Sequence, residues 1–181
     1  MKTVLAIFNN KTDADLAVSH LTQLGHRAKN MSVILKDDTY QSEKGSKGGG
    51  AAAGMGGGAI AGGVIGGFAG LLIGMGAIAV PGIGAFLIGG PIVSALGLTG
   101  AAAATVTGLT TGVLAGGLLG GLVSLGIPEE TAKAYEQKVL EGGVLLAVPI
   151  MLEGEYDRVR EVLENYRANQ IRVINDSRIF G

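Results

Sequence analysis

The chain has 181 residues, a net charge of −1, no cysteine and 33 glycines. The lack of cysteine excludes disulfide frameworks, thiol catalysis and cysteine-ligated metal sites. A balanced charge without a basic cluster gives no reason to expect a nucleic-acid partner. No charged residue occurs between Lys47 and Glu129, and 27 of the glycines lie between Gly48 and Gly126. We therefore divide the chain into residues 1–44, a Gly/Ala-rich apolar insert at 45–127, and residues 128–181.

The first part predicts a strand, a helix and a second strand. Residues 3–8 (TVLAIF) form a continuous apolar run, as in a strand buried on both faces. Asn10 or Thr12 is expected to cap the following helix, and Gly25 to end it. Residues 31–36 (MSVILK) predict a more polar strand. The helix is expected to bury one apolar face, made of Ala14, Ala17, Val18, Leu21 and Leu24.

The insert begins with small residues spaced by four. Large apolar side chains such as Ile65, Phe68 and Leu72 lie between them, which argues against a flexible linker. Residues four apart share one helix face, so this spacing predicts a smooth surface for close helix contact. The positions are Gly50, Gly54, Gly58, Gly62, Gly66, Gly70 and Gly74.

A second set with the same spacing ends the insert, and the two sets together predict a Gly-zipper helical hairpin. Helices over residues 49–79 and 99–125 would be about 45 Å and about 40 Å long, enough for a hydrocarbon core of about 30 Å. Each glycine costs close to 1 kcal/mol in a helix, so tight contacts or lipid are expected to offset this. The second set is Gly100, Ala104, Gly108, Gly112, Gly116, Gly120 and Ser124.

The middle of the insert, residues 80–97, is uncharged and apolar. Pro81 and Pro91 are expected to break the hairpin helices there. An uncharged tip is expected to be buried, either in a bilayer or in a protein assembly.

The last part repeats the pattern of the first after one extra helix. That helix is expected to begin at Pro128, with Glu129 and Glu130 near its positive end, and to stop at Gly142-Gly143. Residues 143–150 (GVLLAVPI) predict a buried strand, residues 155–168 a helix, and residues 170–175 (QIRVIN) a mixed strand. The two helices are expected to bury Ala132, Tyr135, Val139, Leu140, Val159, Val162, Leu163 and Tyr166.

These elements predict an α+β fold, a ferredoxin-like βαββαβ sandwich interrupted by the hairpin. The two apolar strands are expected in the centre, and the second and fourth strands at the edges. Lys36 and Arg172 are the kind of charge that blunts an exposed edge.

No constellation of side chains predicts catalysis, so no catalytic, cofactor or metal site is expected and the protein is interpreted as a non-enzyme. His20 and His26 are six residues apart, which is not a metal-ligand spacing. The glycine-rich run lacks the preceding strand and following Lys-Ser/Thr of a phosphate loop.

The stretch 126–148, with Gly126-Ile127-Pro128-Glu129-Glu130, Tyr135 and Glu141-Gly142-Gly143, resembles a bacterial family of general-stress and low-temperature-induced proteins. The order of strands, helices and hairpin extends the resemblance over nearly the whole chain. It implies a stress-responsive, often membrane-annotated protein without a settled biochemical activity, and it transfers no catalytic residue.

The expected function is therefore structural. The hairpins would bind copies of the same chain and insert into or associate with a membrane, with the sandwich domain in the cytoplasm. One alternative is a soluble particle, shell or filament whose wall or core is built from packed hairpins. Another is a sensor of a small ligand coupled to a membrane pore, which depends on fold analogy alone.

Overall fold

The computed structural model describes residues 2–37, 78–80, 85–95, 113–152 and 154–175. Strands and helices follow one another along these residues, with one short 3-10 helix at Ala28–Asn30. The elements are β1 (Lys2–Phe8), α1 (Lys11–Gln23), β2 (Ser32–Asp37), β3 (Ile78–Val80), β4 (Ala85–Gly89), α4 (Ile92–Ala95), α5 (Val113–Ser124), α6 (Glu129–Leu140), β5 (Val144–Ile150), α7 (Glu155–Asn165) and β6 (Asn169–Ile174).

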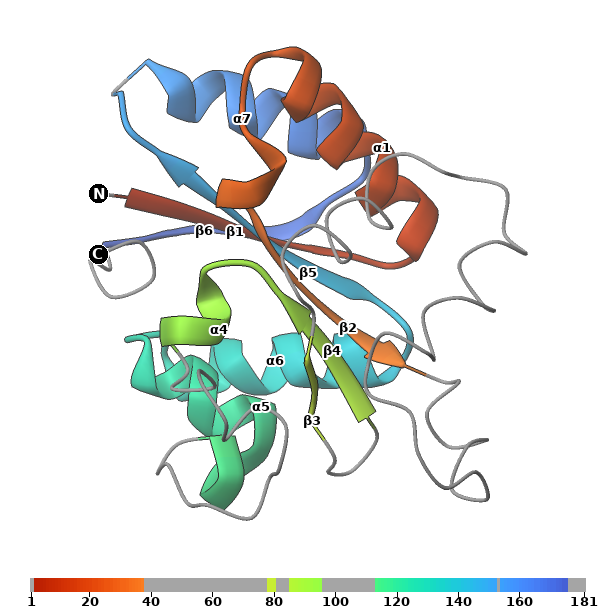
Figure 1. Ribbon diagram of the computed structural model, residues 1–181, viewed down its shortest axis with the longest axis vertical. Coiled ribbons are helices and arrows are strands. Elements are labelled where there is room, and N and C mark those ends of the chain that lie inside the picture. Colours follow the sequence, from red (N-terminus) through yellow and green to blue (C-terminus); the bar gives the residue numbers. More distant parts are fainter. Residues whose placement is uncertain (1, 38–77, 81–84, 96–112, 153, 176–181) are drawn as a thin grey trace.

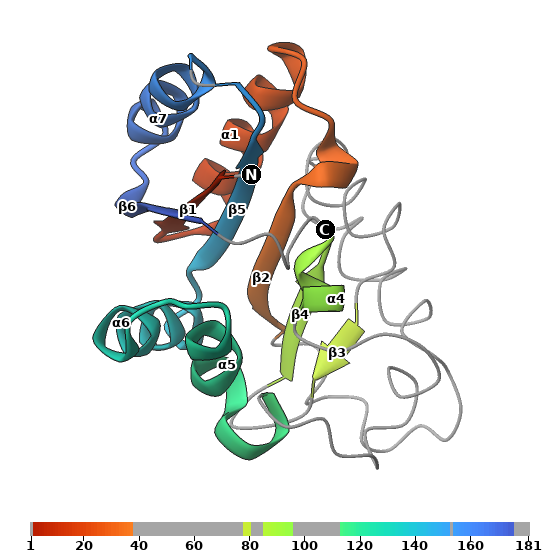
Figure 2. The same ribbon diagram turned by 90° about the vertical axis from the view of Figure 1, so that its left-hand side faces the viewer.

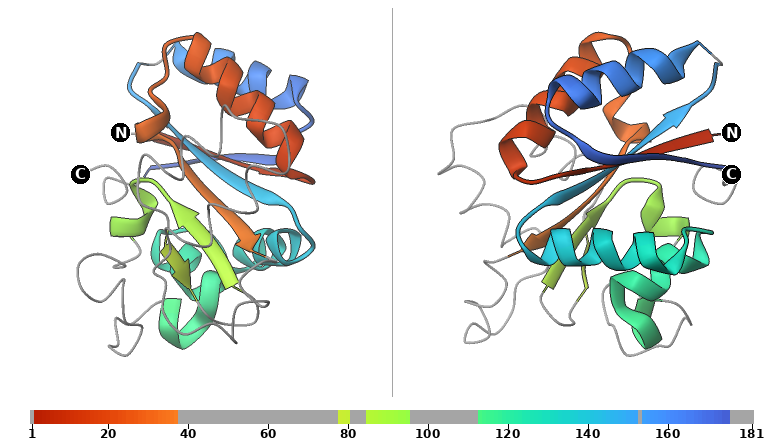
Figure 3. Two further views of the ribbon diagram at one scale, coloured as in Figure 1. Left: turned by 45° about the vertical axis from the view of Figure 1, so that its right-hand side comes forward. Right: turned by 180° about the vertical axis from the view of Figure 1, so that it is seen from behind.

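One six-stranded sheet, in the order β3-β4-β2-β5-β1-β6, forms the middle layer. Every neighbouring pair in it is antiparallel. Helices α1 and α7 cover one face, while α4, α5 and α6 lie on the other (Figure 1). Figure 3 shows the same division in an oblique view and from behind. The predicted α+β class is confirmed.

The two wholly apolar strands occupy the interior of the sheet, as expected. All seven residues of β5 are buried, and β1 is buried from Thr3 onward. Val4 faces Val148 across this central pair. β6 lies at an edge and is mostly exposed, which agrees with its mixed polarity. Burial on both faces explains why an unbroken apolar run was needed in β1 and β5.

The edge position expected for residues 31–36 is wrong. β4 pairs with the outer side of β2, where Leu35 is opposite Leu87, and β3 continues the sheet beyond it (Figure 2). β2 is accordingly buried from Ser32 to Leu35, and Lys36 stands near its end. The covering strand comes from the glycine-rich insert, so the sequence of β2 alone could not reveal it.

The helix expected over residues 49–79 is also wrong at its end, because Ile78–Val80 forms β3. β3 pairs with β4. Both segments contain β-branched or aromatic residues, which are enriched in strands. Ile88 and Ile92 are 1% exposed and lie in the chain's own core. The rest of that expected helix lies outside the described residues.

Local signals in the first helix behave as expected, with one exception. Asn10 caps α1, because its side chain accepts a hydrogen bond of 2.8 Å from the Asp13 amide. Gly25 follows the helix at φ +97°, the left-handed conformation that glycine adopts easily. Leu24, expected on the buried face, is 51% exposed instead.

Two apolar cores lie on opposite faces of the sheet. The first joins β1, β2 and β5 to α1 and α7, and includes Phe8, Leu21 and Leu163. The second joins the same strands to the insert and α6, and includes Leu118, Leu122 and Tyr135. The end of the insert therefore forms one side of the folded domain.

Candidate functional site

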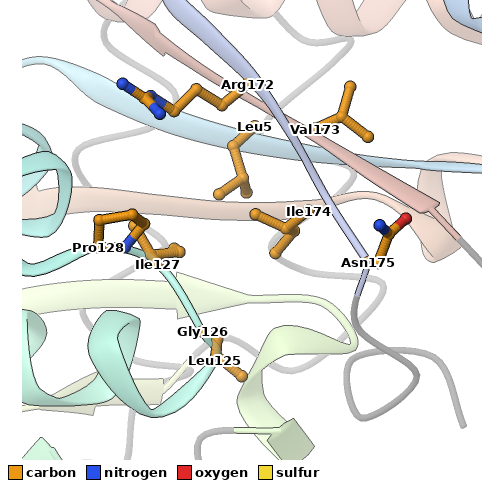
Figure 4. A pocket seen from close by; sticks show the side chains of 9 residues that line it. All are labelled: Leu5, Leu125, Gly126, Ile127, Pro128, Arg172, Val173, Ile174 and Asn175. Atoms are coloured by element: carbon orange, nitrogen blue, oxygen red, sulfur yellow. The ribbon is translucent and has the colours of Figure 1, made fainter.

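A cavity of about 430 Å³, partly open to solvent, lies between β6 and the turn that joins α5 to α6 (Figure 4). Its walls come from β1, β6 and that turn. Polar and apolar atoms contribute nearly equal shares of the exposed lining, and Arg172 and Asn175 add polar side chains. The lining comprises Leu5, Leu125, Gly126, Ile127, Pro128, Arg172, Val173, Ile174 and Asn175.

The α5–α6 turn builds one wall. Gly126 has φ +85°, its amide donates to the Val123 carbonyl, and the Ile127 amide donates to the Leu122 carbonyl. This is the hydrogen-bond pattern of a helix ended by a left-handed glycine. The reversal of the chain turns Leu125 and Ile127 inward, where they are 3% and 2% exposed.

The edge strand β6 builds the opposite wall. Arg172 pairs with Leu5 and Ile174 pairs with Thr3, and cross-strand partners share one face of a sheet. Leu5 belongs to the core beneath α5 and α6, so Arg172 and Ile174 face that side as well. Asn175 follows directly after the strand. The wall therefore alternates apolar and polar side chains along the cavity.

Tyr135 of α6 holds the beginning of β6 in place. Its ring is fully buried, and its hydroxyl donates a hydrogen bond of 2.7 Å to the Gln170 carbonyl. Gln170 has φ +48°, an unusual conformation for a residue with a side chain. Burial raises the pKa of Tyr135 to about 12, and the positive charge of Arg172 acts in the opposite direction. Arg172 is thus close enough to influence the phenol.

Arg172 is exposed and has no carboxylate partner among the residues that the structure describes. The nearest acidic turn, at the beginning of α6, contains Glu129, whose carboxylate lies 2.6 Å from the Lys133 ammonium. That ion pair lowers the pKa of Glu129 and raises the pKa of Lys133. The cavity consequently has a cationic group at its rim.

Among the described residues, the lining includes no histidine, carboxylate, hydroxyl or thiol side chain that could act as nucleophile or general base. In the part of the chain that the structure describes, no three His, Asp or Glu side chains gather as a metal site would require. His20 lies edge-on to Tyr166, with ring centroids 5.8 Å apart.

The expected helix-packing surface is only partly within the described residues. Gly116, Gly120 and Ser124 lie on α5, whereas the set from Gly50 to Gly74 and the positions Gly100, Ala104, Gly108 and Gly112 lie outside the described residues, as does Pro81. Pro91 stands between β4 and α4.

α5 contacts the domain mainly through other positions. Leu118 and Leu122 are buried, Gly120 is half-buried and Ser124 is exposed. The Leu119 amide donates a hydrogen bond of 3.0 Å to a carboxylate oxygen of Glu136, which ties α5 to α6. The helix-packing role of the small residues stays a prediction.

Sequence reasoning did not find the cavity. Arg172 was interpreted only as a charge that protects an edge strand, and residues 170–175 only as a strand of mixed polarity. A single cation between Ile171 and Val173 was the one available signal, and it did not reveal which helix would lie opposite.

No helix within the described ranges is both long and apolar enough to cross a bilayer. Comparison with protein-family models, with curated proteins and with solved structures gives no match for this chain.

Proposed function

We propose that this protein is a non-enzymatic, self-associating structural protein of bacterial stress, and that its insert binds copies of the same chain at or in a membrane. The observation that carries the proposal is the run from Gly48 to Pro128, which contains no charged residue. Such a segment is unfavourable in water unless it is extensively covered. The resemblance to stress-induced bacterial proteins supports the physiological setting.

We further propose that the charged part of the chain is a ferredoxin-like βαββαβ domain. The order β6-β1-β5-β2 with α1 and α7 on one face supports it. β3 and β4 would then be an extension of that sheet, contributed by the insert. The domain would lie in the cytoplasm and position the insert.

The distribution of charge among the helices also supports association through α5. α7 carries exposed ions such as Arg160, and α6, which shares the other face with α4 and α5, carries the exposed pair Glu129 and Lys133, whereas α4 and α5 contain no charged residue. Val123 of α5 is 41% exposed and adjoins the exposed Ser124. Association would therefore involve the outer side of α5.

One observation favours the lipid-free alternative, a soluble particle or filament. Ile88 and Ile92, from the apolar middle of the insert, are covered by the chain's own core. Part of the uncharged insert thus needs no lipid to be buried. Sizing with and without detergent, followed by electron microscopy of any large species, separates the two forms.

Cysteine cross-linking tests self-association directly, because the chain has no cysteine of its own. We expect Ser124→Cys to give disulfide-linked dimers under mild oxidation. The matched control is Glu164→Cys on the exposed side of α7, which we expect to remain monomeric under the same conditions. Equal cross-linking of both variants, or of neither, would contradict association through α5.

A further inference from the structure

We propose that β6 is a second self-association surface, and that it pairs in antiparallel fashion with β6 of another copy of this chain. Val173 of one copy would lie opposite Val173 of the other, on a two-fold axis. The two six-stranded sheets would then become one continuous sheet. This surface is separate from the one proposed on α5, and neither requires the other.

The backbone of β6 is available to a partner strand. β6 is the last strand of the sheet, and within the described ranges no strand lies on its outer side. Figure 2 shows β6 at the margin of the molecule, between α7 and α6. An edge strand presents a row of unpaired N–H and C=O groups, which can bind another strand. Most side chains of β6 are exposed rather than covered by the rest of the domain.

Val173 provides an apolar centre for such a pair. It is 40% exposed, although it is a β-branched aliphatic residue. On its inner side Val173 pairs with Val4, which belongs to the core beneath α1 and α7. Cross-strand partners share one face of a sheet, so Val173 lies on the α7 face. A second Val173 directly opposite would cover the exposed part of this side chain.

Symmetry, charge and backbone conformation limit the register of the pair. A two-fold axis between antiparallel strands keeps their faces aligned, so it passes through one residue position. An axis at Arg172 would place two guanidinium groups directly opposite each other, which destabilises a ladder. An axis at Ile171 would bring Gln170 into the ladder. Gln170 has φ +48°, and its carbonyl already accepts a hydrogen bond within the chain.

An axis at Val173 avoids both problems. Arg172 of each copy then lies opposite Ile174 of the other, and the two arginines are diagonal neighbours about 7–8 Å apart. Their exposed side chains can point away from each other into solvent. The pairing also begins beyond Gln170. Arg172 thus selects the register of the β6 pair, in addition to opposing other contacts at this edge.

The other end of the sheet is a less suitable partner for β6. β3 comprises only Ile78–Val80, whereas β6 comprises Asn169–Ile174. Pairing β6 with β3 of another copy would also be a heterologous contact, which does not close on itself. Pairing β6 with itself gives a closed contact between two copies. Together with the surface on α5, it would allow assemblies larger than a dimer.

Cysteine cross-linking of the full-length protein tests the pair, because the chain has no cysteine of its own. Directly opposite residues in an antiparallel ladder have Cα atoms about 4.5–5.5 Å apart, a separation that a disulfide can span. Val173→Cys should therefore form disulfide-linked dimers about tenfold faster than a cysteine that meets its copy only by collision. The matched control is Leu16→Cys on α1, where the native leucine is 46% exposed. Equal rates for the two variants would overturn the proposal.

A mixture of two variants tests the register. Arg172→Cys and Ile174→Cys, one of them carrying a peptide tag, are combined in equal amounts and oxidised. We expect mainly the mixed dimer, because these positions lie opposite each other only when the axis passes through Val173. An excess of either homodimer would place the axis at another residue and would contradict the proposed pairing.

A charge at the axis tests the strength of the contact without a disulfide. Val173→Lys would place two ammonium groups opposite each other and should weaken self-association through β6 about tenfold in sedimentation experiments. Val173→Thr keeps a β-branched side chain and should change it less than about twofold. Equal association of the lysine and threonine variants would overturn the proposal. The α5 surface is measured separately through Ser124→Cys, so either surface can fail while the other remains.

Discussion

Replacing Gly90 by alanine tests whether the insert is built into the sheet domain. Gly90 directly follows β4 with φ +94°, and its backbone lies against the beginning of β2. A Cβ atom at this position would overlap the Met31 carbonyl oxygen and approach the Ser32 Cα atom to 2.7 Å. Both neighbours are backbone, so a rotamer change cannot relieve the overlap. The turn would have to move away from β2.

The expected destabilisation has two parts. A left-handed conformation costs a residue with a side chain about 1–2 kcal/mol. Overlap with packed atoms adds about 1–3 kcal/mol, because the backbone must shift. The shift would also stretch the 3.0 Å hydrogen bond from the Ile92 amide to the buried Ser32 hydroxyl. We therefore expect a loss of about 2–5 kcal/mol, a large share of the stability of an ordinary domain.

Gly25→Ala and Gly142→Ala provide the control. These glycines have φ +97° and +99°, but a Cβ atom would meet nothing within 4 Å. They should lose only the conformational part, about 1–2 kcal/mol. The measurement is urea unfolding of the full-length variants followed by circular dichroism, in one buffer for all. If Gly90→Ala were no more destabilising than Gly25→Ala, the β4–α4 turn would not lie against β2.

Three smaller predictions concern single hydrogen bonds. Asn10→Ala should lower the free energy of unfolding by about 1 kcal/mol in thermal melts, because the Asp13 amide loses its cap. Burial raises the pKa of Tyr135 above its unfolded value, so its contribution to stability is complete below about pH 10 and declines as pH rises toward 12. Tyr135→Phe should lose that decline in urea midpoints measured from pH 8 to 11.5, and should cost about 1 kcal/mol at pH 7. Hydrogen bonds from the Leu152 and Met151 amides lower the pKa of Glu155, so its contribution should disappear as pH falls below about 4.5, and urea midpoints of Glu155→Gln should vary less between pH 6 and pH 3.

Sequence patterns predicted the elements whose signals are local. The apolar runs of β1 and β5 correctly predicted burial on both faces, and Asn10 and Gly25 correctly predicted the ends of α1. α6 was predicted from its acidic first turn and its apolar face, and both Ala132 and Tyr135 are buried. Each of these signals depends on neighbours a few residues apart. Such neighbours can be recognised in the sequence without knowledge of the fold.

The insert was predicted less well because its contacts are distant in sequence. The helix expected over residues 49–79 ends in the strand Ile78–Val80, and the apolar middle of the insert contains a second strand, Ala85–Gly89. Ala85–Gly89 pairs with β2, whose sequence precedes it by many residues, and Ile78–Val80 pairs in turn with Ala85–Gly89. The cavity could not be predicted for the same reason. Its walls, Ile127 and Ile174, meet only when β6 lies opposite the α5–α6 turn.

The insert shares an apolar core with the central strands of the sheet. Ile88, Ile92, Leu118 and Leu122 are buried together with Leu5 and Ile34 of the central strands. Removing the insert would expose both sets, and each large apolar side chain contributes about 1.5–3 kcal/mol when buried. The sheet domain and the insert therefore stabilise one another. A bilayer or a second copy that binds the insert would act on the same core that supports β6 and the cavity, because Leu5 belongs to both.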